Sequence, residues 1–265
     1  MEPREQTVAH TLQGRSVHTH WTAAYRQADN EPFYTAAFDL IASHLPAGAR
    51  VLDAGCGSGT KTAHLLSRGF EVTAVDLSQP MLEDAERALR AAYPDARVRF
   101  QQADLTRLPF PDGHFPAVLC WGVLMHIPDV DAALRELCRV TASGGILVLS
   151  ENNRNALDAR FIRLVRRLRG PQPGRETRQT PQGEERWETT PDGTMVTRYA
   201  DPAWIEKVAV ECGLTLESLQ PGEFTQLYAA APKAFRRPMH LFNRMWFKHA
   251  RNASLALGQL FVFRR

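Results

Sequence analysis

The sequence lacks the features that mark several classes of protein. Its four cysteines are far apart and form no Cys-x-x-Cys pair, so neither a disulfide framework nor a zinc site is expected. No apolar run reaches the roughly 18 residues of a membrane-spanning helix. The first fourteen residues contain acids and no apolar segment of the kind that a signal peptide needs. We therefore predict a reducing, cytoplasmic location.

Excess charge of either sign is also absent. The net charge is only +3 over 265 residues, with 44% hydrophobic and 23% charged residues. These values are ordinary for a globular protein and do not by themselves indicate a nucleic-acid partner. His18 and His20 form a pair without a third ligand nearby in the sequence, so no metal is expected.

The sequence does contain a regular alternation of strand and helix patterns. Runs rich in Val, Ile and Leu predict seven strands, at 50–55, 71–76, 98–104, 116–121, 144–150, 214–220 and 259–265. Helices are expected at 33–45, 60–68, 78–92, 130–140, 154–170 and 201–213. This order predicts an α/β fold with a doubly wound, mostly parallel sheet, whose last two strands are antiparallel at one edge.

A glycine-rich loop, VLDAGCGSGT, follows the first predicted strand. Gly55, Gly57 and Gly59 permit positive φ and close approach of a ligand to the main chain. The third glycine comes one place too early for the dinucleotide fingerprint G-x-G-x-x-G, and the Gly-Lys pair of a P-loop is absent. Asp53 would disfavour a pyrophosphate and favour a sulfonium or an ammonium. The loop therefore argues against a nicotinamide dehydrogenase.

Polar groups follow the other predicted strands. Asp76 ends the second strand, Asp104 the third and Cys120 the fourth, and Glu151 follows the fifth. Ligands of open parallel sheets bind outside the carboxyl ends of the strands. These residues are therefore expected at one edge of the sheet, where they suit a ligand with a ribose, an adenine and a cationic end.

Five sequence blocks together resemble one family. VLDAGCGSGT, VTAVDLSQPML, QADLTRLPFPDGHF, GVLMHIPD and SGGILVLS are similar, in order and spacing, to class I S-adenosylmethionine-dependent methyltransferases. The likeness is greatest to the small-molecule branch typified by ubiquinone and menaquinone biosynthesis, and it covers residues 20–150. One departure is Pro116, where the family usually has Asp. The resemblance implies a Rossmann-like methyltransferase fold, S-adenosylmethionine as cofactor and S-adenosylhomocysteine as product.

The resemblance also implies which residues hold the cofactor. They are Tyr25, Asp53, Gly55, Cys56, Gly57, Gly59, Asp76, Leu77, Met81, Asp104, Leu105 and Cys120. Asp76 would bind both ribose hydroxyls, and Asp104 would accept a hydrogen bond from the adenine amino group. The Cys120 carbonyl would accept one from the methionine ammonium, and Tyr25 would fold over the cofactor. Taken alone, Tyr25 is better interpreted as packing of an N-terminal helix than as a ligand.

The expected chemistry needs few catalytic groups. A sulfonium methyl is already activated, so the enzyme has mainly to align the nucleophile behind it. A base is needed only for a hydroxyl or a protonated amine, and not for a carbon nucleophile. His126 and Glu151 are the candidate bases, and each has a purely structural interpretation as well.

The acceptor is expected to meet the second half of the chain. We predict one domain, 1–265, in which residues 151–200 and 221–258 form a mainly helical cap over the cofactor-binding core, 20–150. Within the cap, residues 171–193 are polar and rich in Pro and Gly, which predicts a loop or flap.

The last part of the chain has an unusual charge distribution. Residues 224–265 contain no Asp or Glu, and aromatic residues recur there at helical spacing, with Pro238 placed to open the helix. This pattern fits a cap for an acidic or amphiphilic small molecule, a helix lying on an anionic membrane, or a core-packed helix with a solvated basic face.

We therefore predict an enzyme that methylates a small molecule at O, N or C. A methyltransferase of RNA or protein is one alternative, although no RNA-binding module accompanies the basic segment. The other is a non-catalytic partner that binds S-adenosylmethionine. The acceptor and the oligomeric state stay open.

Overall fold

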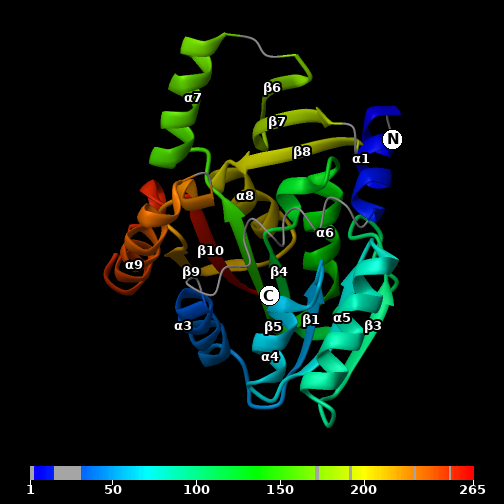
Figure 1. Ribbon diagram of the computed structural model, residues 1–265. Coiled ribbons are helices and arrows are strands. Elements are labelled where there is room, and N and C mark those ends of the chain that lie inside the picture. The colour runs from blue at the N-terminus through cyan, green and yellow to red at the C-terminus, as the bar shows by residue number, and fades with distance from the viewer. Residues whose placement is uncertain (1–2, 15–30, 171–172, 191–192, 230, 251) are drawn as a thin grey trace.

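A seven-stranded sheet forms the centre of the molecule in a computed structural model (Figure 1), which describes residues 3–14, 31–170, 173–190, 193–229, 231–250 and 252–265. Its strands are β1 (Arg50–Ala54), β2 (Glu71–Asp76), β3 (Val98–Gln102), β4 (Phe115–Trp121), β5 (Thr141–Asn152), β9 (Thr215–Pro221) and β10 (Gly258–Arg264). They lie in the order β3-β2-β1-β4-β5-β10-β9. Only β10 runs against its neighbours, β5 and β9, so the predicted doubly wound, mostly parallel sheet is confirmed.

Helices cover both faces of this sheet. The covering helices are α3 (Glu31–Ser43), α4 (Thr60–Leu66), α5 (Gln79–Ala92), α6 (Val130–Val140) and α8 (Pro202–Glu211). Val51 packs with α3, α4 and α5, whereas the next residue, Leu52, packs with α6 and α8. This alternation follows from the two-residue period of a strand, and it explains why β1 is apolar on both faces.

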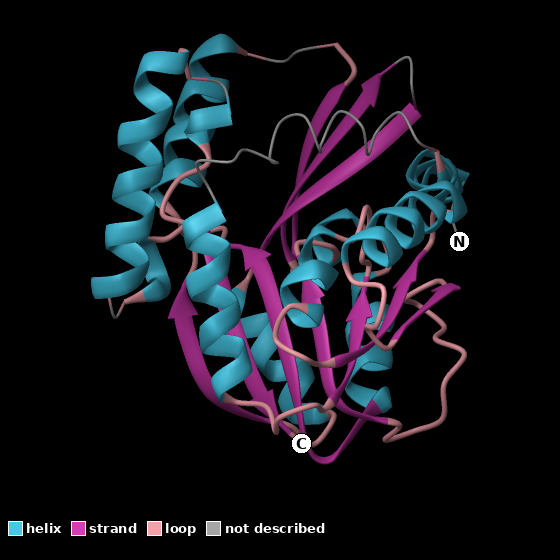
Figure 2. Ribbon diagram, turned by 60° about the horizontal axis from the view of Figure 1, so that its bottom comes forward, coloured by secondary structure: helices cyan, strands magenta, loops and turns pink. Residues whose placement is uncertain are grey.

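A second, three-stranded antiparallel sheet occupies the region that was predicted to be a loop. It consists of β6 (Arg175–Thr180), β7 (Gly183–Thr190) and β8 (Gly193–Ala200). In Figure 2 its strands lie beyond one end of the main sheet. The loop prediction was wrong because much of the sheet's interior is made of charge pairs, Glu184 with Arg186 at 2.7 Å and Glu185 with Arg198 at 2.8 Å. Beside them lies one small apolar cluster, of Trp187 and Val196 with Val8.

Three further helices complete the described structure. α1 (Pro3–Gln13) packs along β8, while α7 (Leu157–Arg169) and α9 (Lys233–His249) lie on the left in Figure 1. α9 begins at Lys233, so the prediction that Pro238 opens it was wrong; Pro238 lies inside the helix. Among the described residues, no helix is both long and apolar enough to cross a membrane.

Candidate functional site

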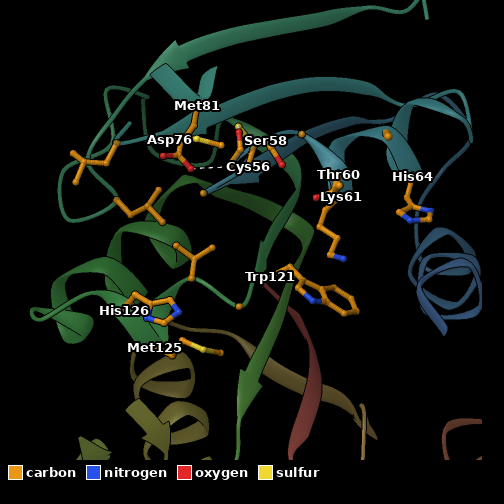
Figure 3. Close-up of a pocket in the computed structure, with 18 of the residues that line it drawn as sticks. Cys56, Ser58, Thr60, Lys61, His64, Asp76, Met81, Trp121, Met125 and His126 are labelled. Atoms are coloured by element: carbon orange, nitrogen blue, oxygen red, sulfur yellow. Dashed lines mark hydrogen bonds between the residues drawn. The ribbon is translucent and has the colours of Figure 1, made fainter. Parts of the chain in front are cut away.

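A cavity of about 1310 Å³ lies over the carboxyl ends of β1, β2 and β4 (Figure 3). Small-molecule sites usually measure about 300–1,000 Å³, so this one has room for a cofactor and an acceptor together. Many of the residues that the sequence singled out line it: Gly55, Cys56, Gly57, Gly59, Asp76, Leu77, Met81, Asp104, Leu105 and His126.

The other predicted site residues do not line this cavity among the described residues. Asp53, Cys120 and Glu151 are buried behind its wall, with 2%, 0% and 3% exposed. Tyr25 lies outside the described residues, as do His18 and His20. The role of the Cys120 carbonyl therefore stays a prediction.

Asp76, at the end of β2, is held in a fixed orientation. Its Oδ2 accepts a hydrogen bond from the Gly57 amide and its Oδ1 from the Ser78 amide, both at 2.8 Å. A carboxylate oxygen has two lone pairs, so each oxygen retains one acceptor site. The two backbone donors thus prepare Asp76 to accept two more hydrogen bonds from a ligand in the cavity.

Glycine is needed at positions 55 and 57 of the loop for different physical reasons. Gly57 has φ +52°, and a Cβ there would meet open space, so its main chain is exposed to a ligand. At Gly55 a Cβ would lie only 2.5 Å from Val123 Cγ2, so packing requires this glycine. The loop therefore combines a fixed path with a bare surface toward the cavity.

Asp53 supports the loop from behind. The Thr62 hydroxyl donates to its Oδ2 at 2.6 Å, which ties the end of β1 to the first turn of α4. Burial raises the pKa of Asp53 to about 6, and Asp76 acts in the same direction, while Thr62 and Lys61 oppose it. The resemblance gives Asp53 the role of supporting the glycine loop, and its bond to Thr62 is consistent with that role; its effect on a cationic ligand stays a prediction.

Beyond the glycine loop, after β2 and β3, the cavity is lined by apolar side chains and one carboxylate, that of Asp104. Met81 and Leu105 are each 5% exposed and line the cavity together with Leu77. The exposed Asp104 accepts from both the amide and the hydroxyl of Thr106, through Oδ1. Two apolar walls and a fixed carboxylate suit a flat ring that carries an amino group.

His126 faces the cavity from a short helix, η2 (Leu124–His126). Its Nδ1 lies 2.9 Å from the Val196 carbonyl oxygen on β8. Because a carbonyl only accepts, Nδ1 carries the proton of a neutral ring and Nε2 is the basic nitrogen. The second sheet thus sets the tautomer of His126, a contact that sequence reasoning missed along with the sheet.

Two buried side chains, Arg198 and Glu151, hold η2 in place. Arg198, 1% exposed, donates to the carbonyl oxygens of Leu124, Ile127 and Pro128 at 2.9–3.1 Å. Glu151 Oε1 accepts from the Leu124 amide at 3.2 Å.

Glu151 does not lie where a base could reach a ligand in the cavity. Burial raises the pKa of Glu151 to about 8, although backbone amides and Arg198 partly oppose this shift. Because its carboxyl is buried against η2 and does not line the cavity among the described residues, we interpret Glu151 as a positioning residue.

Lys61 is a cavity residue that sequence reasoning missed. Its Nζ lies 2.8 Å from the centre of the Tyr34 ring and 5.6 Å from that of Trp121, and Figure 3 shows it pointing toward Trp121. Burial lowers the pKa of Lys61 to about 7, against the charges of Glu223, Glu31 and Asp53. The available signal was its place just after the glycine loop.

Comparisons with known proteins point to one family. Residues 52–149 match a family model described as a methyltransferase domain. A demethylmenaquinone methyltransferase from Clavibacter sepedonicus is 42% identical over 105 residues, which are 40% of this chain and 42% of that protein. A ubiquinone biosynthesis O-methyltransferase from Alkalilimnicola ehrlichii is 30% identical over 176 residues, 65% of this chain and 63% of that protein. The chain thus spans less than two thirds of the length of these relatives.

A solved structure supports the fold along the whole chain. Magnesium protoporphyrin IX methyltransferase from Synechocystis, solved with bound SAH, superposes with a TM-score of 0.66 at 17% identity. The match covers 98% of this chain and 100% of that one. Residues 52–149 of this chain therefore match a methyltransferase domain, and the chain as a whole has the fold of S-adenosylmethionine-dependent methyltransferases.

Proposed function

We propose that this protein transfers the methyl group of S-adenosylmethionine to a small-molecule acceptor. One observation carries the proposal: a single cavity joins the oriented Asp76 carboxylate and the bare Gly57 main chain to His126. Its volume of about 1310 Å³ leaves space beyond a nucleoside-sized ligand, and the acceptor would occupy that space beside Trp121 and Met125.

The residues present fit this cofactor. The two remaining acceptor sites of Asp76 match the two ribose hydroxyls, and the slot beside Met81 and Leu105 matches the adenine. The Asp104 carboxylate would accept from the adenine amino group. The open position at Gly57 would let the methionine part pass close to the main chain.

When bound, the cofactor supplies a methyl group on a positively charged sulfur. The chain's own residues would then bind the cofactor and the acceptor, orient them toward each other and exclude water. Trp121 and Met125 give the acceptor end apolar walls. For a hydroxyl acceptor, His126 Nε2 would take the proton as the oxygen attacks the methyl group; a protonated amine would have to give its proton to Nε2 first and then attack with the freed lone pair. A carbon nucleophile would leave His126 with an orienting role.

The acceptor class is proposed from the cap and from the relatives. Two matched relatives are named for quinone biosynthesis, and one of them is an O-methyltransferase. The cavity wall combines aromatic and apolar side chains with Lys61, which suits a hydroxyaromatic compound with an acidic group.

The division into a core of 20–150 and a cap of 151–200 and 221–258 is part of this proposal, as is a cytoplasmic location.

A screen for transfer of labelled methyl groups tests the proposal. The purified protein is incubated with labelled S-adenosylmethionine and a metabolite extract, and labelled products are separated by mass. Transfer to a small molecule is expected, and it should be absent with Asp76→Ala. Calorimetric heat with NADH and none with S-adenosylhomocysteine would overturn the proposal. A parallel incubation with total RNA and protein tests the alternative substrate classes, which label in those fractions and none in small molecules would favour.

A further inference from the structure

α7 carries an exposed apolar stripe that the site does not use. Leu157, Phe161, Leu164 and Leu168 are 42%, 55%, 54% and 80% exposed. Their spacing of four, three and four residues places them along one side of the helix. The buried side holds Asp158 and Ala159, so the stripe faces away from the protein. A row of four exposed apolar side chains on one helix indicates an interaction surface.

α9 has a similar stripe. Phe235, Leu241, Phe242 and Met245 are between 47% and 62% exposed. The helix is fixed by its other side, where Asn243 exchanges two hydrogen bonds with Thr225 and is fully buried. The sequence allowed three interpretations of this segment, and the exposure of Phe242 favours an interface over a simple core-packed helix.

Basic residues border both stripes. Arg160 and Arg167 are exposed beside the α7 stripe, and Arg237, Arg244 and Lys248 are exposed on α9. Few acidic residues lie among these basic residues on α7 and α9. Asp158 is the one acid of α7 and is bonded to the Thr225 hydroxyl at 2.7 Å, while 224–265 contains no acid at all.

The two helices belong to one side of the molecule. Thr225 bonds to Asp158 of α7 and to Asn243 of α9, so a single residue joins the two elements. Figure 1 places both helices on the same side. The exposed residues of the two stripes, with the basic residues beside them, are here called the α7–α9 face.

We propose that the α7–α9 face binds the surface of membranes that contain anionic phospholipids. Apolar side chains flanked by Arg and Lys are the pattern of helices that lie in the interface, with apolar groups below the headgroups and cations among the phosphates. A protein partner would need a matching acidic groove, whereas an anionic bilayer matches any arrangement of these cations. The proposal goes beyond methyl transfer and does not depend on it.

The position of the face suggests what membrane contact would do. Gln226, next to the shared Thr225, lines the cavity. α9 also packs on α3, where the Phe33 and Phe247 ring centres are 5.2 Å apart, and the neighbouring Tyr34 lines the cavity. A bilayer bound at the α7–α9 face would therefore lie beside the acceptor end, where an amphiphilic acceptor would enter.

Sedimentation with lipid vesicles tests the proposal. The full chain is mixed with sucrose-loaded vesicles of phosphatidylcholine alone, or of phosphatidylcholine with one third phosphatidylglycerol. We expect binding to the anionic vesicles only, and a decrease at 0.5 M salt. Phe161→Ser with Met245→Ser should weaken binding at least tenfold. Arg167→Gln with Arg244→Gln should weaken it by more than tenfold, since each cation near an anionic surface contributes about fivefold.

Matched controls separate the face from general surface properties. Val210→Ser removes an equally exposed apolar side chain from α8 (55% exposed), and Arg99→Gln removes an exposed cation from β3. Both should bind vesicles like the unaltered protein. No binding to anionic vesicles, or equal loss in the control variants, would overturn the proposal. So would self-association or RNA binding that depends on Phe161 while vesicles remain unbound.

Discussion

Replacing Asp76 by alanine tests the cofactor site directly. In the structure each carboxylate oxygen already accepts one backbone amide, from Gly57 or Ser78, and keeps one acceptor site. We expect the two ribose hydroxyls to use these sites. A hydrogen bond to a charged group contributes about 1.5–3 kcal/mol, so two contribute about 3–6 kcal/mol. Because the cavity is open to solvent, the lower value is the better guide, and it corresponds to roughly a hundredfold loss of affinity.

Calorimetry with S-adenosylhomocysteine gives the required measurement. Asp76→Ala also leaves the two amides without their carboxylate, so thermal unfolding of each variant must accompany the titration. Asp76→Asn keeps the shape and one carbonyl oxygen, and it should lie between the two. Asp95→Ala, an exposed acid on a loop, is the matched control and should bind normally. Affinity of Asp76→Ala within twofold of the unaltered protein would refute the assignment.

Three other substitutions separate catalysis, positioning and stability. His126→Gln should lower kcat at least a hundredfold for a hydroxyl acceptor while the affinity for S-adenosylhomocysteine changes less than twofold; full activity would exclude His126 as a base. Arg198→Lys keeps the charge beside Glu185 but cannot reach three carbonyls at once, so kcat should fall about tenfold with the cofactor affinity unchanged, as steady-state kinetics and calorimetry would show. Burial raises the pKa of Glu151 to about 8, so the folded protein keeps this carboxyl protonated at pH values where the unfolded chain ionises it. The contribution of Glu151 to the free energy of unfolding is therefore fully present below pH 4.5. It falls by on the order of 5 kcal/mol as the pH rises to about 8. Denaturant unfolding of Glu151→Gln should therefore depend less on pH over that range, and parallel pH curves for the two proteins would contradict the assignment.

The main sheet and the glycine loop were predictable because their signals are local. A strand buried on both faces is a short apolar run, as in β1, and residues 50–54 show it plainly. Asp76 was predictable for a similar reason, since strand ends of a parallel sheet share one edge. The last two strands were predicted to be antiparallel at one edge, and β10 is antiparallel to β9, the edge strand, as well as to β5.

The second sheet was not predictable because its interior is largely ionic, with only a small apolar cluster around Trp187 and Val196. Along β8 the buried positions are Thr194, Val196, Arg198 and Ala200. Because these include a threonine and an arginine, the strand does not show the alternation of apolar and polar residues that marks a half-buried strand. Arg198 looks like a surface residue until its partner, Glu185, is known to be buried beside it. Contacts between segments far apart in the sequence, such as Arg198 with Leu124, leave no mark in either segment alone.

The bonds from Arg198 to η2 end on main-chain carbonyls. Every amino acid supplies such a carbonyl, so these bonds do not depend on the side chains at 124 and 127, which are constrained by packing in the core instead. Exchange of β6–β8 for the corresponding segment of another protein of this fold would therefore keep η2 attached, provided that the new segment supplies Arg198 together with Glu185.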